Sequence, residues 1–467
     1  MKTDFTLQRR VSYPDIPQRP QALASELFSI ALDDDKYIVY APLRKSAFIG
    51  NSAVVNFLAD LKEHPELLAQ NSELIHFLRN IGIINDKPET KPITSFSGAP
   101  KPVTITLFLT NACNLRCTYC YASAGVAPIH HMSLDVAKHG IDFIINNAVT
   151  QNVPYIRITY HGGGEPSVNW KVMTNSLAYA KAQAEKHGLN VHASSATNGM
   201  LNDKQSDWFI RQLDGASISF DGLPRVHDKF RVTTSGHGSS QHIENTLKRF
   251  DIAGFNYGLR MTVTHEQIAT LPDSVEYICR RFNPAKIQVE PAYQMGKWAT
   301  APSAETDEFI AAFREAQARA RKYTKQIDFS AARVGLSTNH FCSVSQDNFA
   351  LSADGNVSAC YEVFSEDDPY ASHFFYGEPD HVNGGYTFNI DVLNRLRNQA
   401  VQNRKYCEEC FAKWNCAGDC YSKLLHASDG KEIKGSNRCH IIRELSKDQI
   451  LQKISDSGGL FWCEPTV

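Results

Sequence analysis

The middle of the chain alternates between two hydrophobic patterns. Short apolar runs rich in β-branched and aromatic residues predict strands, and the segments between them repeat apolar positions at helical spacing. The predicted strands are residues 104–110, 155–161, 190–197, 216–220, 257–264 and 286–290, and the main helical segments are residues 134–147, 171–187, 204–213 and 243–252. Six such units predict an α/β fold with parallel strands, a partial (β/α)6 TIM barrel over residues 96–330. Chemistry in such barrels lies at the carboxyl ends of the strands.

The N-terminal part, residues 1–95, follows a different pattern. Its predicted elements are a strand at 36–43, a hairpin partner at 46–49, and helices at 52–63 and 72–81. This order predicts a small α+β module, joined to the barrel by a polar, proline-bearing linker.

The remaining region, residues 331–467, has little periodic apolar pattern and predicts a loop-rich domain. With 467 residues, 42% of them hydrophobic, the chain can bury a large core, and its net charge of −2 gives no reason to expect nucleic acid. No apolar run is long enough to span a bilayer, and no apolar signal region follows Met1. We therefore expect a cytoplasmic protein with neither nucleic-acid nor membrane partners.

The twelve cysteines change this picture. Ten fall in two groups, one near residue 115 and one between residues 342 and 439, and only Cys279 and Cys463 stand apart. In a reducing compartment, cysteines at such short spacings indicate metal binding, whereas a secreted protein would use them for disulfides. We favour metal, and we assign neither Cys279 nor Cys463 to it.

The first cysteine group follows the first predicted barrel strand. Cys113, Cys117 and Cys120 have the spacing Cys-x3-Cys-x2-Cys and offer three thiolates on one tight loop. A four-iron cluster held by three cysteines keeps one iron without a protein ligand. A zinc site is the alternative, but structural zinc prefers four closed ligands.

These residues resemble the radical S-adenosylmethionine (SAM) superfamily, and motifs at later strand ends agree with it in order. The second strand ends in a Gly-Gly-Gly-Glu-Pro turn, the third in Thr-Asn-Gly, and the fourth in Ser-Ile-Ser-Phe-Asp-Gly. The resemblance implies a [4Fe–4S] cluster on the cysteine loop, whose open iron chelates SAM and passes an electron to its sulfonium. It also implies SAM contacts at Tyr119, Gly163, Gly164, Glu165, Pro166, Thr197, Asn198, Ser219 and Asp221.

Three further features accompany these motifs. The segment from His227 to Ser239 resembles the same superfamily. Arg260 and Glu290, on the fifth and sixth strands, point to the same barrel mouth if the strands alternate. Salt-bridged barrel positions are the alternative for both.

The second cysteine group resembles the SPASM extension of peptide maturases and anaerobic sulfatase maturases, which carries two auxiliary [4Fe–4S] clusters. The resemblance implies a cluster farther from the barrel on Cys407, Cys410, Cys416 and Cys439, and a nearer one on Cys342, Cys360 and Cys420. No extra cysteine lies between Cys342 and Cys360, so the nearer cluster has an open iron or a ligand such as His340 or Asp347. Zinc on Cys407, Cys410, Cys416 and Cys420 is the alternative to the farther cluster.

The N-terminal module resembles the PqqD-like element that recognises leader peptides in many peptide maturases. Such elements add the peptide backbone to an exposed strand edge. We expect the strand at 36–43 or its hairpin partner to offer that edge, with Tyr37, Tyr40 and Phe48 supplying pockets. A cap that packs on the barrel is the alternative.

Together these resemblances imply an oxidoreductase that modifies a ribosomally made precursor peptide through a 5′-deoxyadenosyl radical, by net oxidation such as side-chain cross-linking. Its cofactors would be three [4Fe–4S] clusters and SAM, and its electrons would come from a flavodoxin or ferredoxin. Formylglycine formation in a sulfatase is one alternative. A non-catalytic iron–sulfur electron carrier or scaffold is another, although it would not need the strand-end motifs for SAM. No residue is singled out as a general base.

Overall fold

The computed structural model describes residues 22–69, 72–125, 128–293, 297, 306–428 and 435–464. The first 21 residues of the predicted N-terminal module therefore lie outside the described residues. The chain divides into two compact units. The larger comprises Thr94–Arg333 and Thr338–Leu445, and the smaller comprises Met1–Ile93, Val334–Ser337 and Ser446–Val467.

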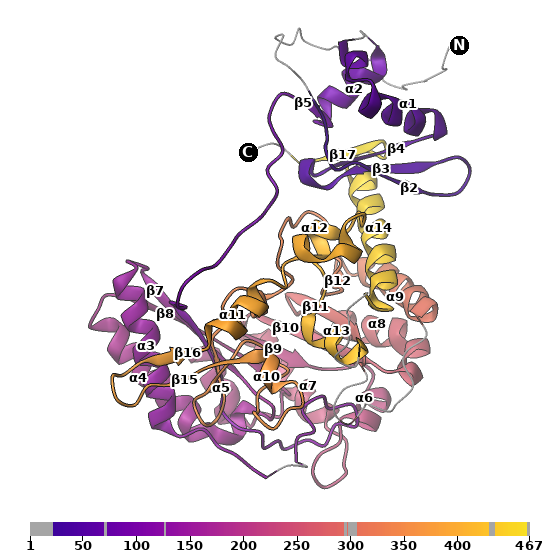
Figure 1. Ribbon diagram of the computed structural model, residues 1–467. Coiled ribbons are helices and arrows are strands. Elements are labelled where there is room, and N and C mark those ends of the chain that lie inside the picture. The colour runs from indigo at the N-terminus through magenta and orange to yellow at the C-terminus, as the bar shows by residue number, and fades with distance from the viewer. Residues whose placement is uncertain are drawn as a thin grey trace. The chain divides into compact units, whose positions relative to one another are not determined.

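A run of parallel strands forms the centre of the larger unit (Figure 1). These strands are β6 (Thr104–Phe108), β7 (Tyr155–His161), β8 (Asn190–Thr197), β9 (Gly215–Ser219), β10 (Tyr257–Val263), β11 (Lys286–Pro291) and β12 (Ile327–Asp328). Each pairs in parallel with the next in chain order, which confirms the six predicted strands and the α/β class. Pairing in chain order brings their carboxyl ends to one edge, while closure into a partial barrel stays a prediction.

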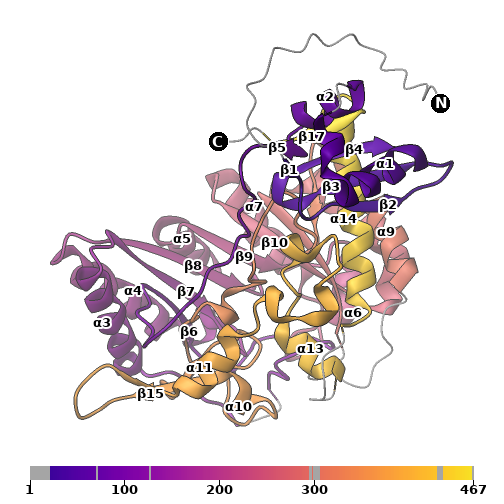
Figure 2. The ribbon, with the colours of Figure 1, turned by 45° about the horizontal axis from the view of Figure 1, so that its top comes forward.

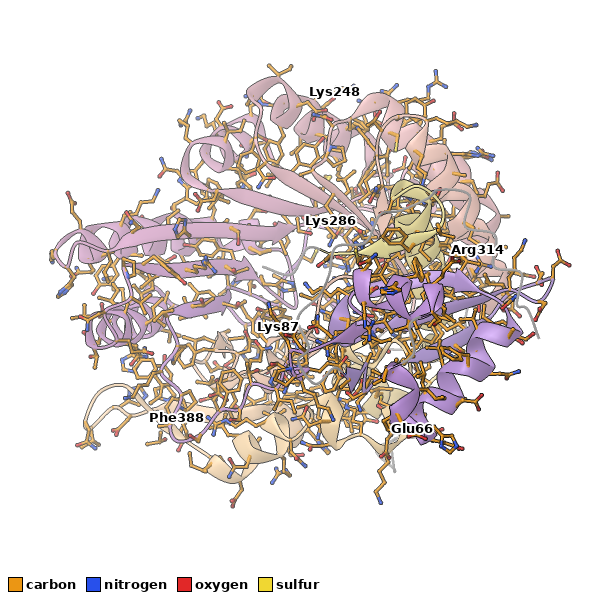
Figure 3. The ribbon with its side chains drawn as sticks, turned by 90° about the horizontal axis from the view of Figure 1, so that it is seen from above. Glu66, Lys87, Lys248, Lys286, Arg314 and Phe388 are labelled. Carbon is orange, nitrogen blue, oxygen red and sulfur yellow. The ribbon has the colours of Figure 1, made fainter. Side chains whose placement is uncertain are left out.

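Helices connect these strands and cover the sheet. They are α3 (Leu134–Thr150), α4 (Trp170–Glu185), α5 (Asp203–Gln212), α6 (Pro224–Phe230), α7 (Ser240–Ala253), α8 (Leu271–Arg281) and α9 (Thr306–Arg321). Their starts follow local chemistry, since Ser133 caps α3 and Asn202 forms a capping box with Gln205 at α5. Their apolar faces join the strands in one core, whereas charged side chains such as Lys248 of α7 point outwards (Figure 3).

The C-terminal region adds four strands to the same sheet. They are β13 (Ala350–Leu351), β14 (Val357–Ser358), β15 (Phe375–Pro379) and β16 (Tyr386–Phe388). β13 pairs in parallel with β6, and β14, β15 and β16 continue antiparallel; Figure 2 shows β15 on the β6 side of the sheet. Gly140 of α3 permits this close packing, because a Cβ there would lie 2.4 Å from Leu351 Cδ1. Residues 350–388 are still mostly loop, as expected, but the sequence did not predict their pairing with the sheet, since two- to five-residue strands leave too little pattern to be recognised.

Helices complete the C-terminal region, four of them short and the last one 19 residues long. They are α10 (Ala371–Phe374), α11 (Ile390–Arg397), α12 (Lys413–Cys416), α13 (Tyr421–Ser428) and α14 (Arg438–Asp456). Helix α14 continues from the larger unit into the smaller one. Among the described helices, none combines the length and the apolar character that crossing a membrane requires.

The smaller unit contains a four-stranded sheet in the order β17-β4-β3-β2. Its strands are β2 (Phe28–Ala31), β3 (Tyr37–Ala41), β4 (Ser46–Gly50) and β17 (Phe461–Cys463). Helices α1 (Ser52–Glu63) and α2 (Glu73–Asn80) share its core, and β1 (Ala22–Leu23) pairs separately with β5 (Ile84–Asn85). The predicted hairpin and both helices are confirmed, and the C-terminal segment completes the sheet.

This topology corrects the expected peptide-binding edge. β3 lies between β2 and β4, and β4 lies between β3 and β17, so neither strand presents a free edge. Tyr40 and Phe48 are 1% and 0% exposed and belong to the interior instead of forming surface pockets. The sequence could not show this, because β17 pairs across more than 400 residues of chain. Among the described strands of this sheet, the edges are β2 and β17.

Replacing Phe48 with Ala should destabilise the smaller unit. The ring is fully buried and packs edge-on against Phe77 at 5.3 Å between centroids. Loss of such a ring costs about 3–5 kcal/mol. Thermal and urea unfolding monitored in this unit should show the loss, while Ser29→Ala, an exposed change on β2, should leave the transition unchanged. A stable Phe48→Ala variant that only bound peptide less tightly would restore the surface-pocket interpretation.

Candidate active site

The first cysteine loop follows β6 and is fastened to a distant segment. Arg116 N donates to Val232 O at 2.7 Å, and Thr118 N donates to Phe230 O at 2.9 Å. Leu115, between the first two cysteines, is fully buried. Cys113, Cys117 and Cys120 remain partly exposed on this held loop. The loop is thus anchored by its backbone, which leaves the three thiols available as ligands.

Two side chains donate towards these thiols. Asn198 Nδ2 lies 3.6 Å from Cys113 Sγ, and Arg231 Nη1 lies 3.9 Å from Cys117 Sγ. Burial raises the pKa of Cys113 to about 12, and the nearby Glu165 charge raises it further. Burial also raises the pKa of Cys117, against the lowering effect of Arg231. These thiols would become thiolates on binding iron, and donors to sulfur are groups that tune iron–sulfur sites.

The Gly-Gly-Gly-Glu-Pro turn after β7 packs directly on the cysteine loop. Gly164 N donates to Thr110 O at 3.0 Å, and Glu165 N donates to Ala112 O at 2.8 Å. A Cβ on Gly164 would lie 2.0 Å from Ala112 O, so only glycine fits there. A Cβ on Gly163 would lie 2.1 Å from the Phe364 ring. These two glycines thus allow the turn to approach other parts of the chain, and their predicted contact with SAM stays a prediction.

Glu165 links the ends of two strands through its buried carboxylate. Its Oε1 accepts from Thr197 Oγ1 at 2.9 Å and from Ser167 N at 3.1 Å, and its Oε2 accepts from Asn198 N at 2.7 Å. Glu165 is 2% exposed, and burial raises its pKa although these hydrogen bonds lower it. Pro166 begins the short helix Pro166–Asn169 that Glu165 caps. Four predicted cofactor residues, Glu165, Pro166, Thr197 and Asn198, therefore lie together at the ends of β7 and β8.

Asp221, after β9, is a second buried carboxylate with several donors. Its Oδ2 accepts from Arg231 Nε at 2.9 Å and from the Tyr119 hydroxyl, and its Oδ1 accepts from Thr262 N at 3.0 Å. The Arg231 guanidinium carbon lies 5.1 Å from the centre of the Tyr119 ring. Asp221 thus orients Arg231 and Tyr119 beside Cys117, and its direct contact with a ribose stays a prediction.

Arg231 is a candidate site residue that the sequence analysis did not select. The signal was present, because Arg231 stands four residues after His227 in the segment that resembles the superfamily. His227 is fully buried, accepts from Asp221 N at 3.2 Å and contacts Ser239 Oγ at 2.9 Å. Burial lowers the His227 pKa to about 4, so the ring is neutral and holds the segment in place.

Two other predicted residues on the later strands, Ser219 and Glu290, have surroundings that differ from those of Asp221. Ser219 ends β9 and pairs with Arg260 of β10, which stays exposed. Glu290 of β11 is 2% exposed and accepts from Ser330 N at 2.8 Å and from Arg438 Nη1 at 3.3 Å. Burial opposes ionisation, but the charges of Arg438, Lys423 and Arg260 lower the pKa of Glu290 overall. Glu290 is therefore a buried, salt-bridged barrel position, which was the alternative interpretation of this residue.

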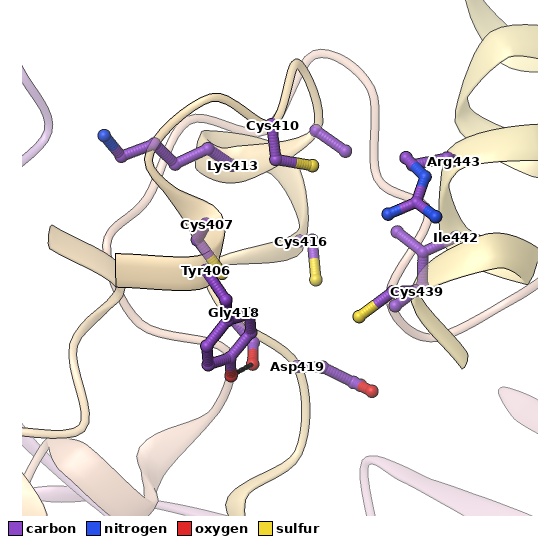
Figure 4. A pocket seen from close by; sticks show the side chains of 11 residues that line it. Tyr406, Cys407, Cys410, Lys413, Cys416, Gly418, Asp419, Cys439, Ile442 and Arg443 are labelled. Atoms are coloured by element: carbon purple, nitrogen blue, oxygen red, sulfur yellow. Dashed lines mark hydrogen bonds between the residues drawn. The ribbon is translucent and has the colours of Figure 1, made fainter. Parts of the chain in front are cut away.

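Four cysteines of the second group surround one cavity (Figure 4). They are Cys407, Cys410, Cys416 and Cys439, the set implied for the farther cluster. Ala412 and Ile442 give the cavity apolar walls, and Asp419 and Arg443 lie at its margin. Cys420, which the zinc alternative required, is not part of the lining.

The cavity fits an iron–sulfur cluster better than a single ion. Zinc would need its four ligand atoms within about 2.0–2.3 Å of one point. Across the described ranges, no three His, Cys, Asp or Glu side chains come together closely enough to bind one ion. All twelve cysteines are free thiols, so none is committed to a disulfide. Four thiols around one wider space form the donor set that a four-iron cluster takes.

The other three cysteines form a separate, buried group. Burial raises the pKa of Cys342, Cys360 and Cys420, and Cys420 lies close enough to both partners for their charges to raise it further. Neither suggested fourth ligand faces them. His340 contacts Ser345 Oγ at 2.8 Å and Thr94 O at 3.2 Å, and Asp347 accepts two hydrogen bonds from Arg397 at 2.6 and 2.7 Å.

Tyr121 lies between the first cysteine loop and this buried group. Its ring is within electrostatic range of Cys120 and of Cys360, and burial is the main cause of its raised pKa. The hydroxyl donates to Gly162 O at 3.3 Å and to Tyr361 O at 3.5 Å. His161, whose pKa burial lowers to about 4, stacks on Tyr361 at 5.3 Å. Tyr121 thus lies near cysteines of both groups and joins the aromatic residues Tyr361 and His161.

Comparison with known proteins finds relatives for the part of the chain that contains this site. Residues 107–278 match the radical SAM superfamily. The sporulation killing factor maturation protein SkfB of Bacillus subtilis is 25% identical over 269 residues, 56% of this chain and 60% of that protein. A cysteine-type anaerobic sulfatase-maturating enzyme of Clostridium novyi is 24% identical over 169 residues, 35% of this chain and 44% of that protein. The chain thus spans about half the length of these curated relatives.

Solved structures share the fold. The structure of anSMEcpe with bound AdoMet superposes with a TM-score of 0.58 at 16% identity, covering 74% of this chain and 96% of that one. The same protein has also been solved with AdoMet and the Cp18Cys peptide. At this identity the likeness concerns the fold alone.

Replacing Cys113, Cys117 and Cys120 together with Ala should remove about four of about twelve irons, because thiolates are the ligands of such clusters. Formation of 5′-deoxyadenosine should fall to the background. Iron analysis and chromatography of the nucleoside measure both effects after anaerobic reconstitution. Cys463→Ala, which removes a thiol from β17 in the smaller unit, serves as the control. Continued SAM cleavage by the triple variant would disprove the site.

Proposed function

The chain contains a radical SAM superfamily domain over residues 107–278, and from this premise we propose that it post-translationally modifies a ribosomally synthesised precursor peptide. One observation supports the proposal above others. The cysteine loop is joined by hydrogen bonds to the polar ends of β7, β8 and β9, so thiols, buried carboxylates and Arg231 form a single site. An electron carrier would have no use for that assembly.

The cluster, when bound, supplies the electron for reductive cleavage of SAM. The residues of this chain arrange the surroundings of the three cysteines that would hold it. Asn198 and Arg231 donate towards the sulfurs of Cys113 and Cys117, and Asp221 orients Arg231. Tyr121 and His161 add two aromatic groups that stay uncharged near neutral pH.

We propose a net two-electron oxidation of the substrate. The peptide would lose one hydrogen atom to the 5′-deoxyadenosyl radical, then one electron and one proton as a new side-chain bond forms. The two further cysteine groups support an exit for that electron, and three [4Fe–4S] clusters in all. An external carrier such as a flavodoxin or ferredoxin would supply reducing electrons in the cytoplasm.

Formylglycine formation is the second candidate. It is supported by the Clostridium novyi relative and by the fold shared with anSMEcpe. Both candidates require SAM cleavage, so they differ only in the substrate and its product.

Two peptides distinguish these functions. The reconstituted enzyme is given SAM, a reductant, and either a precursor peptide encoded by a neighbouring short reading frame or a sulfatase peptide. We expect only the precursor to stimulate 5′-deoxyadenosine formation and to lose the mass of two hydrogen atoms, seen by mass spectrometry. Conversion of the Cys or Ser of the sulfatase peptide to an aldehyde would favour the second candidate. No SAM cleavage with any substrate would favour the electron carrier.

The smaller unit supports a place for peptide recognition, now on β2. Leu32 N donates to Lys36 O at 2.8 Å, which fixes the phase of the antiparallel β2–β3 ladder. Because ladder hydrogen bonds alternate, the N–H groups of Phe28 and Ile30 face β3, and those of Ser29 and Ala31 face the free edge. An extended leader peptide could pair with these outward groups.

Ser29→Pro should weaken leader binding without unfolding the sheet. Proline removes one outward donor and is tolerated on edge strands. Loss of one backbone hydrogen bond, about 0.5–1.5 kcal/mol, corresponds to a roughly two- to twelvefold weaker Kd by titration calorimetry. Ser29→Ala keeps the donor and should bind as the parent does. Equal affinity for both variants, with unchanged thermal unfolding, would exclude the β2 edge.

A further inference from the structure

The buried cysteine group at Cys342, Cys360 and Cys420 has no fourth thiol within reach. Of the other nine cysteines, three stand on the first loop and four surround the cavity of Figure 4. Cys279 is buried in α8, and Cys463 belongs to β17. His340 and Asp347 are engaged by Ser345, Thr94 and Arg397. A fourth ligand must therefore come from another kind of residue or from outside the chain.

Glu362 lies two residues after Cys360, on a loop that is closed by Ser358. The fully buried Ser358 hydroxyl accepts from Cys360 N at 3.2 Å and donates to Val363 O at 2.6 Å. This double contact holds residues 360–363 in one conformation. Glu362 Oε2 lies 4.0 Å from Cys420 Sγ, although 58 residues separate the two in the chain.

One oxygen of the Glu362 carboxylate faces a cysteine, and the other faces the positive charge of Lys423. Oε1 lies 3.8 Å from Lys423 Nζ, and Lys423 follows Cys420 by one turn at the start of α13. Both side chains are largely buried, at 20% and 7% exposure.

We propose that Glu362 is the fourth ligand of the auxiliary cluster that Cys342, Cys360 and Cys420 hold. The inference rests on the proposed function in one respect, since it requires a four-iron cluster at these cysteines. A carboxylate oxygen is an available iron ligand, and Lys423 is placed to orient it as outer groups orient metal ligands. The fourth ligand position of this cluster, which the cysteine spacing leaves open, is then filled by a side chain of the protein itself.

The test compares Glu362→Gln, Glu362→Cys and the parent, all full-length and reconstituted with excess SAM, which protects the open iron of the first cluster. After mild oxidation, Glu362→Gln should lose about one iron per chain and show a three-iron signal in electron paramagnetic resonance, because a three-cysteine site releases its unligated iron. Glu362→Cys should keep the full iron content. It should also shift the midpoint potential of one cluster downwards, because a thiolate donates more electron density than a carboxylate.

Glu366→Gln is the matched control, since Glu366 is exposed and accepts from Asn356 Nδ2 at 2.7 Å, away from the cysteines. It should behave as the parent. Glu362 variants with the parent's iron content, oxidation behaviour and potentials would overturn the ligand assignment while the auxiliary cluster stands. A parent protein with only about eight irons, from two clusters, would overturn the ligand and the cluster together.

Discussion

The buried carboxylate of Glu165 is the interaction on which the candidate site depends. It accepts hydrogen bonds from Ser167, Thr197 and Asn198, and its own backbone N–H donates to Ala112. One residue therefore joins the ends of β7 and β8 to the cysteine loop. Burying a carboxylate without such donors would cost several kcal/mol. The same donors that stabilise the charge thus fix the position of Asn198 beside Cys113.

Asp221 repeats this arrangement on the other side of the loop. It accepts from Tyr119, Arg231 and Thr262, and Arg231 in turn lies beside Cys117. Because Arg231 is paired, its buried positive charge is compensated where it meets the thiol. Each of two cysteines therefore has a donor that a buried carboxylate positions. Glu362 differs from these carboxylates, since one of its oxygens faces a cysteine itself while the other faces Lys423.

Two late strands pair with strands from much earlier in the chain, and both pairings have functional consequences. β13 pairs with β6, which brings the residues after Cys342 to the strand that precedes the first cysteine loop. β17 pairs with β4, so the smaller sheet contains strands from both ends of the chain. This second pairing encloses β4 and leaves β2 as the longer of the two described edges. Removing residues 1–85 would therefore also deprive β17 of its partner.

The sequence by itself determined the parallel strands, their order and the residues at their ends, because hydrophobic periodicity and short motifs are local. It also separated the cysteines into sets, and Cys407, Cys410, Cys416 and Cys439 do surround one cavity. Only the tertiary structure decided which edge of the small sheet is free, since β17 is remote in the chain. It also decided what faces the remaining cysteines. Spacing pointed to His340 and Asp347, but Ser345 and Arg397 engage them. Glu362 lies next to Cys420 instead, on the loop that Ser358 closes. Side-chain partners of this kind depend on long-range packing, which no local pattern encodes.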